Sequence, residues 1–224
     1  MALTADFSLY VILDVAHLRG RDLLQLATDL CRGGASIVQY RAKGEGEPFH
    51  REAIPRILEA VHPFEIPLIV NDEIDLAIRY GADGVHLGRG DLPIAEARRR
   101  EPGLIIGATV HSPEEARDAI AAGADYLGVG SIYPTRTKTD IRLVGLDTLA
   151  LICGISTIPV IAIGGIDEER VDEILSRGAH GIAVISAVLD EDDPARAARR
   201  LRERVDRYLR KNRSRPGPSD HSRL

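Results

Sequence analysis

Short apolar runs alternate along the chain with segments whose apolar residues recur with helical spacing. The apolar runs are predicted strands at residues 8–14, 36–41, 67–71, 84–88, 104–108, 125–130, 158–164 and 181–185. Segments such as 113–120 have the periodicity of amphipathic helices. Strands that are apolar on both faces and separated by helices indicate a parallel sheet covered by helices. Eight such units within 224 residues predict an α/β protein, a single (β/α)8 TIM barrel.

The dipeptide Gly-Ala punctuates this pattern. It begins at Gly34, Gly81, Gly123 and Gly178, each time between a helical segment and a predicted strand. Glycine suits the left-handed backbone conformation that often ends a helix. These dipeptides therefore predict helix-to-strand turns, which lie on the face of such a barrel opposite to the active site.

The pattern also predicts the domain organisation. We expect residues 1–209 to form the catalytic barrel domain and residues 210–224, which mix basic residues with Pro, Gly and Ser, to be a disordered tail. The N-terminal apolar run has no basic leader and contains Asp14, so we expect neither a signal peptide nor a membrane span. A cytoplasmic location is the corresponding expectation.

Composition narrows the function classes. The hydrophobic content of 44% and charged content of 28% are ordinary for a globular protein. The formal net charge of −5 argues against nucleic acid as a partner, because that partner requires a clustered excess of Lys and Arg. Cys31 and Cys153 lie in apolar runs and are expected to be reduced thiols. A local cationic site for a small anion is compatible with all of this.

Polar residues collect at the predicted carboxyl ends of the strands, where a barrel of this class carries its active site. Arg41 and Lys43 stand two residues apart, so strand alternation favours their pointing the same way. Asp72 and Asp91 follow neighbouring strands. Two carboxylates there suit a hard divalent cation such as Mg²⁺, although each alone also fits a helix N-cap.

Later strands end in residues that suit phosphate. Gly164-Gly165 and Ser186 stand where barrels of this kind bind phosphate through main-chain N–H groups, although a tight turn would also explain the glycines. Between these elements, Thr135, Thr137 and Lys138 offer hydroxyls and an ammonium group to phosphate oxygens. A solvated surface loop is the alternative for this segment.

These motifs together resemble the thiamine-phosphate synthase family. The motifs, in order, are QYRAK at 39–43, ND at 71–72, GVHLG at 84–88 with Asp91, GSIYPTRTK at 130–138, GGI at 164–166 and VIS at 184–186. The resemblance covers about residues 8–209. Each motif alone is weak, but the PTxTK loop combined with ND and the spaced aspartate is specific.

The resemblance implies a transferase that joins 4-amino-2-methyl-5-(diphosphooxymethyl)pyrimidine to 4-methyl-5-(2-phosphooxyethyl)thiazole, releases pyrophosphate and uses Mg²⁺. It implies that Asp72 and Asp91 bind the metal, and that Arg41, Lys43 and Lys138 are catalytic. The residues implied for the pyrimidine diphosphate are Gln39, Tyr40, Arg41, Ala42, Lys43, Asn71, Thr109 and Lys138. The residues implied for the thiazole phosphate are Thr135, Arg136, Thr137, Gly165, Ile185 and Ser186. Thr109 replaces the serine that the family usually has.

Two alternatives stay open. In thiazole tautomerases, a related branch, a histidine near the position of His111 is thought to move protons. That reaction would not need the diphosphate-binding residues Arg41 and Lys43. The other alternative is a non-catalytic barrel that binds the same precursors. The expected partners are the two phosphorylated small molecules, with no nucleic acid and no membrane, and a homo-oligomer is left open.

Overall fold

The computed structural model describes residues 6–135 and 142–213. In these residues eight parallel strands close into one barrel in chain order, with β8 pairing with β1. The strands are β1 (Leu9–Asp14), β2 (Ile37–Arg41), β3 (Leu68–Asn71), β4 (Gly84–Leu87), β5 (Ile105–Val110), β6 (Tyr126–Val129), β7 (Val160–Ile163) and β8 (Gly181–Val184). The predicted (β/α)8 barrel is confirmed, and each predicted strand is present with its ends moved by at most two residues.

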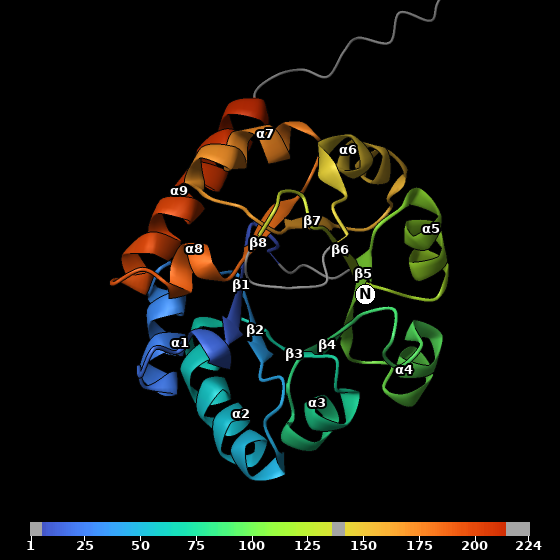
Figure 1. The fold of residues 1–224 in the computed structure, drawn as a ribbon. Helices are drawn as coiled ribbons and strands as arrows, with labels where there is room; N and C mark the ends of the chain where they lie inside the picture. Colours follow the sequence, from blue (N-terminus) through green and yellow to red (C-terminus); the bar gives the residue numbers. More distant parts are fainter. Residues whose placement is uncertain (1–5, 136–141, 214–224) are drawn as a thin grey trace, which may run out of the picture.

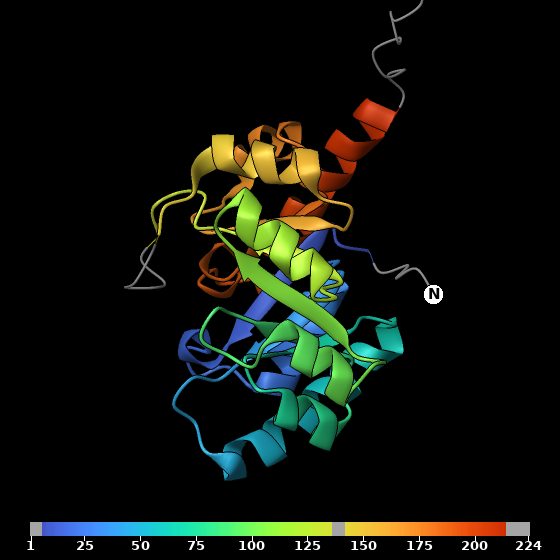
Figure 2. The same ribbon diagram turned by 90° about the vertical axis from the view of Figure 1, so that its right-hand side faces the viewer.

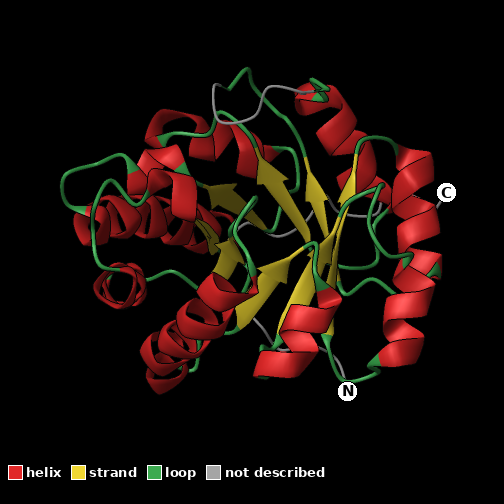
Figure 3. Ribbon diagram, turned by 60° about the horizontal axis from the view of Figure 1, so that its bottom comes forward, coloured by secondary structure: helices red, strands yellow, loops and turns green. Residues whose placement is uncertain are grey.

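Helices surround the barrel as an outer ring (Figures 1 and 3). The α-helices are α1 (Leu23–Arg32), α2 (Glu47–Val61), α3 (Ile74–Tyr80), α4 (Ile94–Arg100), α5 (Pro113–Ala121), α6 (Gly145–Ile155), α7 (Val171–Ser176), α8 (Ser186–Leu189) and α9 (Pro194–Arg213). Short 3-10 helices lie at Val15–His17, His62–Phe64 and Glu168–Arg170. In the side view of Figure 2, the helices lie along the outside of the barrel. No described helix is both long enough and apolar enough to span a bilayer.

Local sequence signals explain where helices begin and end. The Asp22 carboxylate caps α1 by accepting from the Gln25 N–H at 2.9 Å. Ser112 caps α5 in the same way, with Pro113 in the first turn. Gly81 and Gly123 have φ values of 71° and 96°, so they adopt the left-handed conformation predicted for the helix-to-strand turns.

The hydrophobic core fills the barrel and the layer between barrel and helices. Strands β1, β6 and β8 are buried along their whole length. Helix α9 closes the ring by packing against α1 and α7. A Cβ atom on Gly33, at the end of α1, would lie 2.6 Å from the Cβ of Ala198, so glycine permits the close approach of α1 and α9. Helix α9 continues to Arg213, past residue 209, where the sequence pattern predicts the domain to end.

Candidate active site

A cavity of about 360 Å³ opens at the carboxyl ends of the strands. Side chains two residues apart on a strand reach it together: Gln39 and Arg41 from β2, with Lys43 beyond. The predicted site residues that line it are Gln39, Arg41, Lys43, Asn71, Asp72, Asp91, Thr109, Thr135, Gly165, Ile185 and Ser186. The tertiary structure therefore brings together residues from strands far apart in the sequence, as a barrel predicts.

Two predicted residues do not line this cavity. The side chain of Tyr40 alternates to the outer face of β2, where its hydroxyl lies 2.8 Å from Nδ1 of His50. Tyr40 and Ala42 line a separate, much smaller cavity instead. The predicted residues Arg136, Thr137 and Lys138 lie outside the described residues.

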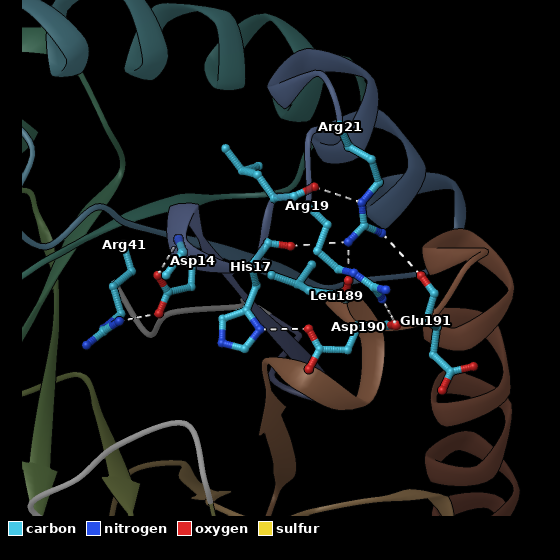
Figure 4. A network of polar contacts seen from close by, with 10 residues as sticks. Asp14, His17, Arg19, Arg21, Arg41, Leu189, Asp190 and Glu191 are labelled. Atoms are coloured by element: carbon cyan, nitrogen blue, oxygen red, sulfur yellow. Dashed lines mark hydrogen bonds and ion pairs between the residues drawn. The ribbon is translucent and has the colours of Figure 1, made fainter.

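Arg41 is held at the cavity by Asp14, the last residue of β1. Asp14 is only 2% exposed, and one of its carboxylate oxygens accepts a hydrogen bond from the Arg41 guanidinium (Figure 4). Its other oxygen accepts from the N–H of Ala16 at 3.1 Å. The buried Nε of Arg41 has no hydrogen-bond partner among the described residues. Sequence reasoning missed Asp14 as a site residue, although it ends a strand just as Arg41 does.

A second set of contacts joins the segment after β1 to the end of α8 (Figure 4). Nδ1 of His17 lies 2.7 Å from Oδ1 of Asp190. The guanidinium groups of Arg19 and Arg21 donate to the main-chain carbonyls of Leu189, Asp190 and Glu191. Cations suit the carboxyl end of a helix. These bonds therefore fix α8, whose first residue, Ser186, lines the cavity.

Asp72 and Asp91 form an acidic pair beside Lys43. Nζ of Lys43 lies 3.1 Å from Oδ2 of Asp72. Oδ2 of Asp91 accepts from the N–H of Gly88 at 2.7 Å. Burial raises the pKa of Asp91 above its ordinary value, and the neighbouring Asp72 carboxylate raises this pKa further. Two neighbouring carboxylates, one of which raises the pKa of the other, suit a cation between them.

The helix-capping alternative for these aspartates is wrong. The residue at the N-cap of α3 is Glu73, and the one at the N-cap of α4 is Pro93. Neither helix has a side-chain capping bond. Asp72 instead has a φ of 66°, unusual for a residue with a side chain, in a turn closed by the Glu73 N–H donating to Asn71 O at 2.8 Å. Such strained backbone clusters at functional sites, and here it belongs to a residue that lines the cavity.

The donor set fits magnesium better than zinc. Among the described residues no group of three or more His, Cys, Asp and Glu side chains could hold a metal. Zinc sites normally take three or four such protein ligands. Mg²⁺ is commonly bound by one or two carboxylates, with water and substrate phosphate oxygens completing its shell. Asp72 and Asp91 meet that requirement.

A chain of polar side chains crosses the cavity floor. The hydroxyl of Tyr10 lies 2.8 Å from that of Tyr126, which lies 3.0 Å from Nδ1 of His86. Nε2 of His86 lies 2.8 Å from Oγ1 of Thr109, and Nε2 of Gln39 donates to the Tyr10 hydroxyl at 2.7 Å. Sequence reasoning gave Tyr10, Tyr126 and His86 no role. Alternation along their strands could have indicated that they face inward.

His111 lines the cavity, and Glu115 lies against it. Oε2 of Glu115 accepts from the N–H of His111 at 2.7 Å and lies 3.2 Å from its ring Nδ1. Oε1 of Glu115 also lies 3.6 Å from Arg89 and 3.8 Å from Arg142. Glu115 thus links the loops that follow β4, β5 and β6.

Taken together, these features define a class of protein. A closed (β/α)8 barrel whose carboxyl-end cavity is lined by cationic side chains, paired carboxylates and glycine main chain is an enzyme scaffold suited to phosphorylated substrates.

Comparison with known proteins identifies the family. The family model described as thiamine monophosphate synthase matches residues 9–188, and the chain belongs to this family of transferases. The chain is 42% identical over 201 residues to the thiamine-phosphate synthase of Chloroflexus aurantiacus, covering 89% of this chain and 93% of that protein. It is 40% identical over 209 residues to that of Pyrococcus abyssi, covering 93% and 100%. The solved thiamine phosphate pyrophosphorylase from Pyrococcus furiosus superposes with a TM-score of 0.85 at 38% identity, covering 92% of this chain and 98% of that one.

Proposed function

We propose that the chain joins 4-amino-2-methyl-5-(diphosphooxymethyl)pyrimidine to 4-methyl-5-(2-phosphooxyethyl)thiazole, giving thiamine phosphate and pyrophosphate. The observation that carries this proposal is the gathering of Arg41, Lys43, Asp72 and Asp91 around one cavity, beside Thr109. The cations and the acidic pair together suit a diphosphate bound with a divalent ion. The family membership of the chain supports the same reaction.

Breaking the bond to pyrophosphate is the difficult step, because one further negative charge develops on a leaving group that is already polyanionic. Arg41, held by Asp14, and Lys43, beside Asp72, would stabilise that charge as catalytic residues, with Lys138 from the loop. Bound Mg²⁺, held by Asp72 and Asp91, would neutralise the departing diphosphate oxygens.

The nucleophile needs no general base, since the thiazole nitrogen already has a lone pair. The aminopyrimidine ring is electron-rich and can carry the positive charge left on its methylene carbon. We therefore propose a dissociative transition state, in which the cavity's main further contribution is to position the nitrogen against that carbon. Gln39, Asn71 and Thr109, which line the cavity, would orient the pyrimidine.

The thiazole phosphate would occupy the side of the cavity formed after β6, β7 and β8. Gly165, Ile185 and Ser186 line it there, and Thr135 lines the cavity as well. Main-chain N–H groups would bind the phosphate at Gly165 and Ser186, with Thr135, Arg136 and Thr137 adding donors from the loop. We further propose that the barrel, up to the end of α9 at Arg213, acts as one catalytic domain in the cytoplasm.

The decisive experiment supplies both substrates with Mg²⁺ and measures thiamine phosphate and pyrophosphate in equal amounts. A thiazole tautomerase is the rival that one observation favours, because His111 lines the cavity and could exchange a proton with Glu115 beside it. Turnover of thiazole isomers without the pyrimidine would support that rival. Binding of both substrates without any product would instead support a non-catalytic barrel.

A further inference from the structure

We propose that Tyr10, Tyr126 and His86 are positioning residues whose hydrogen-bond relay makes Thr109 a donor to a ring nitrogen of the pyrimidine substrate. This inference rests on the proposed function for the identity of that substrate. It goes beyond that function because it gives Tyr10, Tyr126 and His86, which line the cavity, a role in orienting the Thr109 hydroxyl.

The relay is continuous from one wall of the barrel to the other. It runs from Gln39 on β2 through Tyr10 on β1 and Tyr126 on β6 to His86 on β4, and ends at Thr109 on β5. Its four consecutive contacts measure 2.7, 2.8, 3.0 and 2.8 Å. All of these residues line the cavity.

The direction of the relay follows from counting protons. Burial raises the pKa of both Tyr10 and Tyr126 above the ordinary value, so each phenol keeps its one proton at neutral pH. Tyr10 accepts from the Gln39 amide, and among the described residues Tyr126 is the only other hydrogen-bond partner of its buried hydroxyl, so the Tyr10 proton goes to Tyr126. Tyr126 then donates its proton to Nδ1 of His86.

This direction determines the hydrogen bond between His86 and Thr109, the last contact of the relay. A neutral imidazole that accepts at Nδ1 carries its proton on Nε2. Nε2 of His86 therefore donates to Oγ1 of Thr109. The Thr109 hydroxyl proton is not used by the relay, and Thr109 lines the cavity, so this proton can be donated to a ligand acceptor.

The backbone makes room for the relay. A Cβ atom on Gly107 would lie 2.1 Å from Cζ of Tyr126 and 2.5 Å from Nδ1 of His86. One on Gly128 would lie 3.0 Å from Cε1 of His86. Strand β5 thus has no side chain where Tyr126 and His86 lie against it, and β6 has none where His86 lies against it. Apolar groups of similar shape can replace a buried hydrogen-bonded pair at little cost, so stability alone does not require polar groups here.

The chemistry at Thr109 suits the proposed substrate. An aminopyrimidine ring nitrogen has a lone pair that accepts a hydrogen bond from a hydroxyl. A neutral hydroxyl binds this nitrogen without protonating it, so the ring stays electron-rich and can carry the charge that develops when pyrophosphate departs. A site that donates to this atom would reject an analogue with C–H in its place.

The first test locates the proton on His86 by ¹⁵N NMR of the histidine ring in the unliganded protein. The relay requires a neutral ring with its proton on Nε2 and a bare Nδ1. A proton on Nδ1 would mean that the relay runs from Thr109 towards Gln39, which overturns the proposal. This test does not depend on the proposed reaction.

The second test compares Tyr126→Phe with Ser36→Ala by steady-state kinetics. Tyr126→Phe should raise KM for the pyrimidine diphosphate about fivefold, the worth of about one hydrogen bond, and leave KM for the thiazole phosphate unchanged. Ser36→Ala is the matched control, because it removes a buried hydroxyl at the opposite end of β2, whose hydrogen bonds within the described residues are to the Leu9 main chain. It should change neither KM.

Tyr10→Phe provides a second variant should Tyr126→Phe fail to fold, and its effect on the same KM should be smaller because Tyr126 can still donate to His86. Equal changes in both KM values, or none, would overturn the proposal. If the wild-type protein makes no thiamine phosphate, the proposed function fails, while the NMR result still decides the direction of the relay.

Discussion

Replacing Asp91 by Asn removes one of two neighbouring negative charges and little else. The amide has nearly the same size as the carboxylate. Its oxygen can still accept the hydrogen bond that the Gly88 N–H donates to Oδ2 of Asp91 in the wild-type protein, at 2.7 Å. In the wild-type protein, burial and the Asp72 carboxylate both raise the pKa of Asp91. Without a divalent ion, the ionised Asp91 therefore destabilises the folded state, and Asp91→Asn should stabilise it.

The size of this effect is modest because the site is open to solvent. The side chain of Asp72 is 27% exposed, and Lys43 beside it is 61% exposed, so water screens the repulsion. Partly exposed charge pairs are worth about 0.5–1 kcal/mol. In a domain of this size about 1 kcal/mol shifts Tm by about 2–4 °C. We expect Asp91→Asn to raise Tm by about 1–4 °C at neutral pH in a chelating buffer.

The pH dependence follows from the raised pKa of Asp91. A carboxyl group that holds its proton more tightly in the folded state stabilises that state at low pH and loses this contribution as pH rises through the folded pKa. The advantage of Asp91→Asn should therefore be full at neutral pH and shrink as pH falls through the raised pKa of Asp91.

Magnesium should reverse the order of stability. A ligand complex at about 100 times its dissociation constant stabilises the folded state by about 2.7 kcal/mol. Thermal unfolding with Mg²⁺ and pyrophosphate should therefore raise the Tm of the wild-type protein by several degrees and that of Asp91→Asn much less. Asp118→Asn, an exposed position on α5, controls for the change in net charge. A variant that is less stable than wild type in chelator, or equally stabilised by magnesium pyrophosphate, would refute this reasoning.

Three further substitutions test other parts of the site. Asp14→Ala leaves the Arg41 charge buried without its partner and should cost about 3 kcal/mol in urea unfolding, so a loss below about 1 kcal/mol would show that solvent replaces the carboxylate. Gly107→Ala places a methyl group against the ring of Tyr126 and should cost about 1–3 kcal/mol in the same assay, and unchanged stability would contradict the close approach. Lys138→Ala should raise KM for the pyrimidine diphosphate more than KM for the thiazole phosphate in steady-state kinetics, whereas an equal rise would count against the assignment of Lys138 to the diphosphate.

The sequence by itself determined the barrel and most of the cavity lining. Hydrophobic periodicity is a property of each segment alone, so eight strands and the intervening helices could be predicted without knowing how they pack. Strand alternation correctly placed Arg41 and Lys43 at the same cavity. Asp72 and Asp91 could be assigned to it because the active site of such a barrel lies at the carboxyl ends of its strands. The same alternation places the side chain of Tyr40 on the outer face of β2, against His50.

Only the tertiary structure decided which side chains meet across the barrel. Asp14 reaches Arg41 because β1 and β2 are neighbours in register, a pairing that Asp14's own segment does not reveal. Tyr10 and Tyr126 are separated by 116 residues, yet their hydroxyls meet because closure of the barrel directs both side chains to its interior. The capping alternative for Asp72 and Asp91 was likewise settled by backbone geometry, since the same sequence pattern suits a cap or a ligand. Local patterns specify which face a residue occupies, whereas barrel closure specifies its partner.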